Sequence, residues 1–303
     1  MINRMMGPAE WAMLILLSII WGGSFFLYAV ALSDLPTFTI VFLRVCLGSL
    51  GLWLCAWAMG LLPLRQAGLW RSFFIMGLIN NAIPFSLIVW GQREVASGLA
   101  AILNATTPFF AVLVANLFTA DEKLSWNRLL GALIGLSGVG AMMGTDILAA
   151  QQSSFLSQLA IIAAAVSYGF ASVFGRRFSQ TPPLITAAGQ TAASSMILLP
   201  VMLIIDTPWR LPHPPLSAWL AIAGLAVLCT SLAYILYFTI LKRAGATNIV
   251  LVTFLVPVSA ILLGMSFLGE RLDLHHIIGM ATIALGLALI DGRLIAFLKP
   301  RRT

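Results

Sequence analysis

Apolar residues fill this chain in runs of about 20 residues, and short polar or proline-rich stretches separate the runs. An α-helix rises about 1.5 Å per residue, so about 20 residues cross a hydrocarbon core that is about 30 Å thick. The pattern predicts an all-α integral membrane protein with ten transmembrane helices. The expected helices lie at 10–31, 37–60, 71–92, 97–119, 126–145, 155–175, 183–205, 216–241, 246–268 and 274–295.

Composition changes the picture by making lipid the expected surroundings of the chain. Hydrophobic residues make up 60% of the sequence and charged residues 9%, and the mean hydropathy is +1.01. A water-soluble globule could not cover that much apolar surface. The net charge of +7 would suit nucleic acid, but the basic residues stand singly or in pairs between the runs. We therefore expect a lipid bilayer as partner and no nucleic acid.

The distribution of lysine and arginine between alternate loops predicts the orientation. Thirteen of the 17 basic residues fall on the side that holds both termini, three fall on the opposite side, and Arg44 alone lies within a run. Because positively charged loops stay in the cytoplasm, both termini should be cytoplasmic. The first run lacks a convincing signal-peptide cleavage site and should be retained, as in a multi-pass protein of the inner or plasma membrane.

A proline-containing stretch of the first half returns in the second half. TPFFAVLVANLFTADEKL at 107–124 corresponds to VPVSAILLGMSFLGERL at 256–272, and Pro257 follows Pro108 by 149 residues. After one gap the offset becomes 148, and the acid–base pair at the end of each stretch is again aligned. The chain therefore contains an internal duplication.

The duplication predicts two units of five helices each, at 1–150 and 151–303. Earlier positions match at an offset of 147, as Trp21 does with Tyr168. Five is odd, so the second unit must insert upside down relative to the first. Inverted repeats are typical of carriers that work by alternating access around a central site at the repeat interface. The alternative is that duplication only builds a large bundle, and we favour transport.

Several motifs carry a likeness to a known family. These are the ten-run layout, the stretch Trp21-Gly22-Gly23-Ser24, Arg44 in the second run and the paired P…(D/G)E(K/R)L…G pattern. In these features, over nearly its whole length, the chain resembles the EamA-type members of the drug/metabolite transporter superfamily. The resemblance implies two EamA repeats and transport of a small metabolite. A closer likeness to the YddG-type aromatic amino-acid exporters has less motif support, and the first repeat departs from the usual Gly-Glu with Ala120-Asp121-Glu122.

Charged residues and prolines within the runs are the first candidates for function. All ten acidic residues map at or near the ends of runs, which argues against a proton antiporter built on a buried glutamate. Arg44 lies about 10 Å deep at a rise of about 1.5 Å per residue. It either snorkels to the interface or faces a cavity and contacts a substrate carboxylate. Pro108 and Pro257 fall at mid-run and are either hinges or packing kinks, and their recurrence in both repeats favours hinges.

Neutral polar and aromatic side chains recur at mid-depth in both units and could line a central cavity, although any single aromatic ring could instead face lipid. Such a lining suits a neutral or zwitterionic solute better than a sugar phosphate, which would need several buried cations. We expect export or facilitated passage of neutral amino acids, aromatic ones preferred, with another small metabolite or drug-like amphipathic solute as the alternative. The candidate substrate-binding residues are Trp21, Tyr28, Asn81, Phe85, Asn104, Tyr168, Thr230, Tyr234, Tyr237 and Thr253.

Other classes find less support. The three histidines, His213, His275 and His276, form no catalytic or metal-binding constellation within the runs, so we expect no enzyme, cofactor or metal. A channel or receptor-like bundle is harder to exclude, because neutral polar linings suit those as well. The glycine-rich stretches at 131–140 and 279–286 indicate close helix packing, either within the bundle or between protomers of a homo-oligomer.

Overall fold

The computed structural model describes residues 6–61, 67–119, 126–148, 152–249 and 251–291, and this part of the chain contains helices and no strand. The fold class is all-α, as predicted. The expected unit boundary at residue 150 and the motif Ala120-Asp121-Glu122 lie outside the described residues.

The elements follow one another with short connections. They are α1 (Pro8–Leu32), α2 (Thr37–Ala58), α3 (Ala67–Gly77), η1 (Leu78–Ala82), α4 (Ile83–Gly91), α5 (Ser97–Asn104), α6 (Thr107–Phe118), α7 (Trp126–Leu148), α8 (Gln152–Phe174), η2 (Gly175–Phe178), α9 (Pro183–Val201), η3 (Met202–Asp206), η4 (Pro208–Arg210), α10 (Leu216–Ala223), η5 (Gly224–Leu232), α11 (Ala233–Ala244), α12 (Ala246–Ile249), α13 (Val252–Phe267) and α14 (Leu274–Asp291).

Seven helical segments of the described chain are long and apolar enough to cross a membrane. They are Pro8–Leu32, Thr37–Ala58, Gly68–Gly91, Ser97–Phe118, Ser154–Phe178, Pro183–Asp206 and Leu216–Ala244. Three shorter apolar helices, Leu129–Ala141, Val252–Phe267 and Leu274–Ile290, coincide with the remaining expected runs. The run expected at 246–268 is shorter than predicted because it is divided into α12 and α13.

Three of the long helices of the described chain contain a π-helical segment, and two of these segments lie at corresponding places of the repeats. The first, η1 (Leu78–Ala82), separates α3 from α4, and the second, η5 (Gly224–Leu232), separates α10 from α11. Adding the repeat offset of 149 to Leu78 and Ala82 gives residues 227 and 231, both inside η5. The sequence pattern predicted plain helices here, because hydrophobic periodicity does not distinguish one widened turn.

The two repeat-related prolines occupy different positions in their helices. Pro108 stands in the first turn of α6, directly after the chain bends between α5 and α6. Proline has no backbone N–H to donate to the carbonyl of Asn104, and the hydroxyl of Thr107 donates to that oxygen instead, at 2.7 Å. Pro257 lies inside α13, after a break that precedes Val252. Each of these two runs is therefore broken, but the second break lies near the start of its run and only Pro108 stands directly after a break, so a hinge role for the two prolines stays a prediction.

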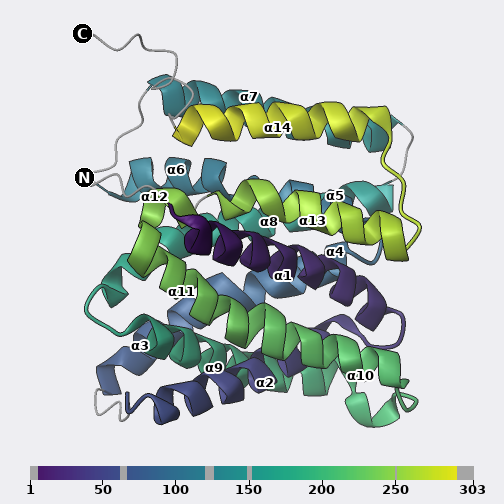
Figure 1. Ribbon diagram of the computed structural model, residues 1–303. Helices are drawn as coiled ribbons and strands as arrows, with labels where there is room; N and C mark the ends of the chain where they lie inside the picture. The colour runs from purple at the N-terminus through teal and green to yellow at the C-terminus, as the bar shows by residue number, and fades with distance from the viewer. Residues whose placement is uncertain (1–5, 62–66, 120–125, 149–151, 250, 292–303) are drawn as a thin grey trace, which may run out of the picture.

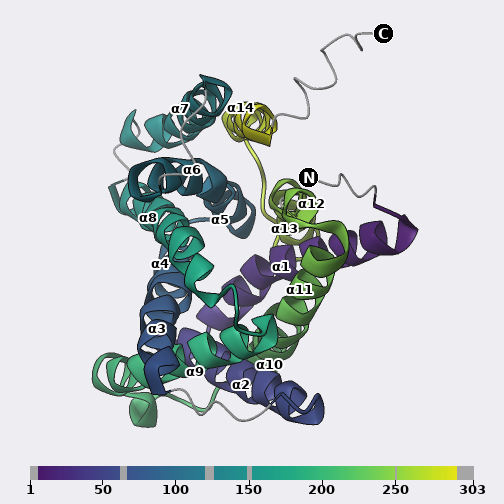
Figure 2. The same ribbon diagram turned by 90° about the vertical axis from the view of Figure 1, so that its left-hand side faces the viewer.

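Helices of the two repeats pack against each other in matching pairs. α1 packs along α13, and α8, which corresponds to α1, packs along α6, which corresponds to part of α13. α2 likewise packs along α9, and α7 packs along α14. Figures 1 and 2 show α7 and α14 side by side at one end of the molecule, with α2 and α9 together at the other.

Small residues allow the closest of these contacts. A Cβ atom added to Gly22 in α1 would lie 2.7 Å from the carbonyl oxygen of Val256 in α13. One added to Gly169 in α8 would lie 3.1 Å from the carbonyl oxygen of Phe110 in α6. Both positions need glycine because two helix backbones meet there.

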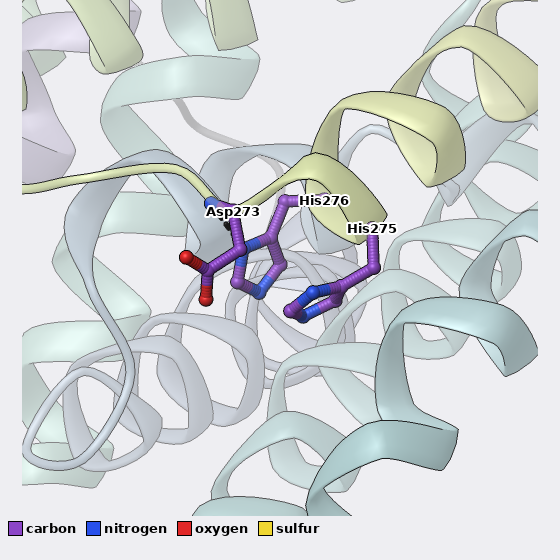
Figure 3. Close-up of side chains that lie close together, drawn as sticks. All are labelled: Asp273, His275 and His276. Carbon is purple, nitrogen blue, oxygen red and sulfur yellow. Dashed lines mark hydrogen bonds between the residues drawn. The ribbon is translucent and has the colours of Figure 1, made fainter.

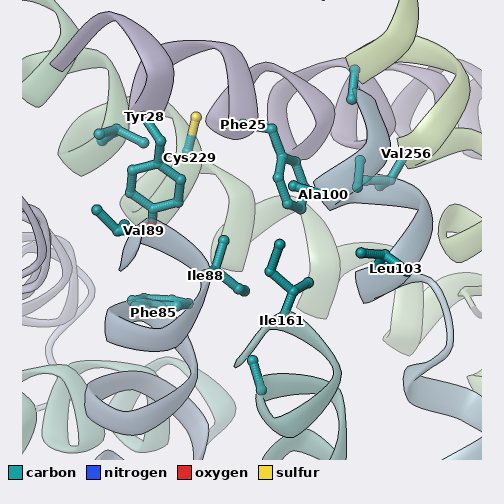
Figure 4. Packing of buried hydrophobic residues seen from close by; sticks show 14 of the residues in the cluster. Phe25, Tyr28, Phe85, Ile88, Val89, Ala100, Leu103, Ile161, Cys229 and Val256 are labelled. Carbon is teal, nitrogen blue, oxygen red and sulfur yellow. The ribbon is translucent and has the colours of Figure 1, made fainter. Parts of the chain in front are cut away.

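The interior is apolar where helices of both repeats meet. Figure 4 shows Phe25 from α1, Val89 from α4, Leu103 from α5, Ile161 from α8 and Val256 from α13 gathered in one buried cluster. Large apolar side chains also stay on the outside, and Ile204 is 76% exposed. Exposed apolar surface of this extent suits contact with lipid.

Candidate functional site

A cavity of about 800 Å³ lies between helices of both repeats. Its lining comes from α1 and α2, from the segment around η1 and α4, from α5, and from α8, α9, α11 and α13. It extends to the exposed connection between α8 and α9, where Arg176, Ser179 and Pro183 line it. The cavity thus reaches the surface on the side of this connection.

Arg44 is a buried charged group in the lining of the cavity. Its side chain is 4% exposed, so it does not snorkel to the interface. Its Nη1 donates to the hydroxyl of Tyr28, its Nη2 donates to the carbonyl of Cys229 at 3.3 Å, and its guanidinium carbon lies 4.1 Å from the ring centroid of Phe85. No carboxylate of the described residues forms an ion pair with it. A guanidinium is always protonated and has five N–H donors, so Arg44 brings a buried positive charge with donor capacity to spare.

The π-helical turn η5 prepares an acceptor for Arg44. Within η5 the hydroxyl of Thr230 donates to the carbonyl of Leu225, five residues earlier, at 2.9 Å. Because its proton is used there, the hydroxyl oxygen can accept, and Nε of Arg44 donates to it at 3.1 Å. Thr230 therefore orients Arg44 from the opposite repeat.

A neutral polar cluster faces the cavity at the corresponding place of the other repeat. Nε2 of Gln190 donates to the hydroxyl of Tyr234 at 3.2 Å, and Nδ2 of Asn80 donates to Oε1 of Gln190 at 3.2 Å. Asn81 is fully buried and reaches the same hydroxyl at 3.4 Å. When the repeat offset is applied, Asn81 corresponds to Thr230 and Tyr234 corresponds to Phe85. Gln190 lies next to the position that corresponds to Arg44, and the cluster carries no charge.

Aromatic rings form much of the remaining wall. The rings of Trp21 and Tyr237 lie 5.6 Å apart between centroids, and Tyr237 meets Phe238 edge to face at 5.3 Å. Tyr168 lines the cavity from α8. Such rings offer flat apolar surface to a bound ring or aliphatic chain.

The structure brings most of the predicted residues together. Those that line the cavity are Trp21, Tyr28, Arg44, Phe85, Asn104, Tyr168, Tyr234, Tyr237 and Thr253. Asn81 and Thr230 lie behind the lining and bond to residues within it. Pro108 is not part of the lining, and Pro257 lines a separate apolar pocket of about 190 Å³.

Sequence reasoning missed Gln190 and left Asn80 out of the candidate set. A signal for Gln190 existed, because the offset of 147 carries Arg44 to residue 191, its direct neighbour. Alignment of the two repeats at the second helix would have pointed to this polar position.

The face opposite the cavity mouth is held by hydrogen bonds between the repeats. A carboxylate oxygen of Asp206 accepts from the backbone N–H of Thr39 at 2.6 Å and from its hydroxyl at 2.9 Å. The carboxylate of Glu270 accepts from the N–H groups of Ser97 and Gly98, at the start of α5, at 2.7 and 3.1 Å. Both acids serve as caps for helix N-termini of the first repeat, because carboxylates are favoured there. These contacts join the two repeats outside the cavity lining.

A separate cluster of Asp273, His275 and His276 stands at the start of α14 (Figure 3), with ligand-type atoms within 4.8 Å of one another. Nδ1 of His276 accepts from the backbone N–H of Asp273 at 3.2 Å. In a neutral imidazole the other nitrogen then carries the proton, which disfavours metal binding through it. The hydrogen bond therefore indicates a structural role for this cluster at the beginning of α14.

Comparisons with known proteins agree over nearly the whole chain. The EamA-like transporter family matches residues 10–144 and again 155–291. The Uncharacterized transporter YoaV of Bacillus subtilis is 25% identical over 275 residues, which cover 90% of this chain and 94% of that protein. The Uncharacterized inner membrane transporter YedA of Escherichia coli K12 is 25% identical over 280 residues, covering 90% and 88%.

Two further matches concern a named exporter and a solved structure. The probable terminal-alkyne amino-acid exporter of Streptantibioticus cattleyicolor is 23% identical over 292 residues, with 95% of each chain covered. A crystal structure described only as that of a protein shares 21% identity with a TM-score of 0.67, covering 95% of this chain and 99% of that chain. The structural likeness supports the fold.

Proposed function

Because the chain belongs to the EamA-like transporter family, it is a multi-pass membrane transporter and not an enzyme, and we propose that it carries neutral amino acids with aromatic or large apolar side chains. Relatives are named as inner membrane transporters, and one is named as an amino-acid exporter. The name of the exporter supports the class of substrate, and the cavity supplies the chemistry.

The observation that carries the proposal is the buried charge of Arg44. A buried cation without an ionic partner is unfavourable. A substrate carboxylate would remove that penalty and accept hydrogen bonds from the remaining guanidinium N–H groups. Arg44 lines the cavity, and its described hydrogen-bond partners are a phenol, a hydroxyl and a backbone carbonyl. A carboxylate-bearing solute is therefore the ligand that best completes the site.

The aromatic wall supports the choice of side chain. Trp21 and Tyr237 form a tilted pair on one side, and Tyr168 lines the cavity from α8. Rings in offset or edge contact contribute about 1 kcal/mol beyond area burial. The volume of about 800 Å³ accommodates an amino acid as large as tryptophan together with water.

Alternating access is the mechanism that this architecture suits. In our proposal the two five-helix repeats, 1–150 and 151–303, are inverted, provide ten spans and place both termini in the cytoplasm. The cavity reaches the surface beside the basic connection that holds Arg176 and Arg177, while Asp206 and Glu270 hold the opposite face closed. This arrangement corresponds to a state open to the cytoplasm, and the opposite state would require those contacts to break.

The test is transport by the purified full chain in proteoliposomes, with a panel of radiolabelled amino acids and with or without a proton gradient. We expect uptake of phenylalanine and tryptophan to exceed uptake of alanine, lysine and glutamate. Unlabelled phenylalanine inside the vesicles should accelerate entry of the label, since a carrier shows counterflow and a pore does not. Absence of counterflow for every amino acid would reject the proposed substrate class.

A further inference from the structure

We propose that the cavity recognises the carboxylate and the apolar side chain of its substrate but not the amine, so that apolar monocarboxylates form a second substrate class. This inference rests on the contact between Arg44 and a carboxylate in the proposed function. The substrates would be acids such as 3-phenylpropionate, which matches phenylalanine in ring and chain length but lacks the amino group.

The first argument is charge balance. Two arginines, Arg44 and Arg176, line the cavity, and among the described residues no aspartate or glutamate lines it. A bound zwitterion and Arg44 together keep a net positive charge, because the ammonium group of the zwitterion adds a second cation near the guanidinium. A monoanion neutralises Arg44 without adding that cation. In surroundings of low dielectric constant this difference favours the monoanion.

The second argument is the supply of acceptors for an ammonium group, which has three N–H donors. On the neutral side of the cavity, Oε1 of Gln190 already accepts from Asn80 and the hydroxyl of Tyr234 already accepts from Gln190. Oδ1 of Asn104 is a buried lining oxygen without a partner among the described residues. The acceptors of the described lining, among them this amide oxygen and the hydroxyls of Ser24 and Thr107, are neutral and give an ammonium group no counter-charge.

The third argument is that the uncharged part of the cavity needs no amine to hold the substrate. Trp21 and Tyr237 offer apolar ring surface, and Phe85 stacks on the guanidinium of Arg44 beside the carboxylate position. A ring on a short chain ending in a carboxylate would meet both features.

The experiment measures displacement of radiolabelled phenylalanine from the purified full chain in lipid nanodiscs at pH 7.4. Binding is preferable to flux because the undissociated acid crosses lipid unaided. The competitors are unlabelled phenylalanine, 3-phenylpropionate and phenethylamine, which has the amine but no carboxylate. We expect 3-phenylpropionate to compete at least as well as phenylalanine, and phenethylamine to be at least tenfold weaker.

Two variants test which side chain binds the carboxylate. Arg44→Gln should abolish thermal stabilisation of the purified protein by 3-phenylpropionate, whereas the matched control Arg210→Gln, an exposed arginine outside the cavity lining, should leave it unchanged. The inference is overturned if 3-phenylpropionate is at least tenfold weaker than phenylalanine, because the amine is then required. It is also overturned if the Arg44→Gln variant, shown to be folded by gel filtration, still binds 3-phenylpropionate with parental affinity.

A direct measurement separates this inference from the proposed function. Thermal stabilisation of the purified protein by 3-phenylpropionate does not depend on binding of any amino acid. Stabilisation by 3-phenylpropionate that Arg44→Gln removes, together with no binding of phenylalanine, would reject amino acids as substrates and support the monocarboxylate class. Binding of phenylalanine without stabilisation by 3-phenylpropionate would support amino acids as substrates and reject the monocarboxylate class.

Discussion

Nε of Arg44 lies 3.1 Å from Oγ1 of Thr230, and this hydrogen bond joins α2 of the first repeat to the π-helical turn of the second. The same hydroxyl donates to the carbonyl of Leu225, which leaves its lone pairs to Arg44. The position of the charged group thus depends on the backbone of the opposite repeat.

Replacing Thr230 should weaken substrate binding through Arg44. Thr230→Val removes the acceptor, and a hydrogen bond to a charged group contributes about 1.5–3 kcal/mol, so the KM for phenylalanine should rise about tenfold or more. Thr230→Ser keeps the hydroxyl and should stay within about threefold of the parent. Concentration-dependent uptake in proteoliposomes of matched protein content measures both. Equal effects of the two substitutions would show that Thr230 acts by packing alone.

The aromatic wall predicts a side-chain-dependent loss. Trp21→Ala removes one ring of the pair whose centroids lie 5.6 Å apart, and uptake of phenylalanine should weaken about five- to tenfold while alanine uptake changes less. Trp219→Ala is the control, because that ring is 47% exposed on the outer surface and is not part of the cavity lining. Equal losses for alanine and phenylalanine would argue against ring recognition.

We expect the contact between Asp206 and Thr39 to control access to the cavity from that face. Asp206→Ala removes the acceptor at 2.6 and 2.9 Å, so the sealed face should open more often. A cysteine placed at Ser24, which lines the cavity, should then react several times faster with a thiol reagent supplied at that face, in a chain without its native cysteines. Asp34→Ala, at an exposed position between α1 and α2, should leave the rate unchanged. An unchanged rate in Asp206→Ala would mean that this contact does not close the cavity.

Glycines between α7 and α14 should be required for folding and not for recognition. A Cβ atom at Gly131 would lie 2.6 Å from the carbonyl oxygen of Gly286, whereas one at Gly140 would meet no atom within 4 Å. Gly131→Leu should therefore lower the yield of monodisperse protein strongly, and Gly140→Leu should not. Fluorescence-detected gel filtration compares the two. Similar yields would place the tight contact elsewhere.

Orientation can be tested by labelling from outside the cell. In a cysteine-free chain, Ser33→Cys and Pro212→Cys should react with an impermeant maleimide, and Gln180→Cys should react only after lysis. The expectation follows from the bias of basic residues between alternate loops. The opposite labelling pattern would reverse the assignment of both termini.

The sequence predicted the helical class, the duplication and several residues of the cavity lining because each leaves a linear signal. Runs of apolar residues mark the helices, the offset near 149 marks the repeat, and equivalent positions such as Phe85 and Tyr234 both reach the cavity. These features depend on local composition and spacing, which the sequence records directly.

The remaining features depend on contacts between distant segments. The choice between snorkelling and a buried position for Arg44 is decided by Tyr28 and Thr230, which lie 16 and 186 residues away in the chain. Gln190 is placed by Tyr234 and Asn80 in the same way. Hydrophobic periodicity carries no information about hydrogen-bond partners that are distant in the chain. The sequence therefore identifies these side chains as polar but does not give their positions in the fold.

The paired π-helical turns η1 and η5 set the rotation of α4 and α11 about their axes, and this rotation decides which side chains face the cavity. A π turn holds one residue more than an α turn, and one residue of an α-helix corresponds to about 100° about its axis. Phe85 follows η1 by three residues and Tyr234 follows η5 by two. Removing one residue from either turn would rotate the following helix by about that angle and swing Phe85 away from Arg44, or Tyr234 away from Gln190. A deletion that alters no lining side chain would then abolish the lining, because the widened turns set the angle at which each repeat presents it.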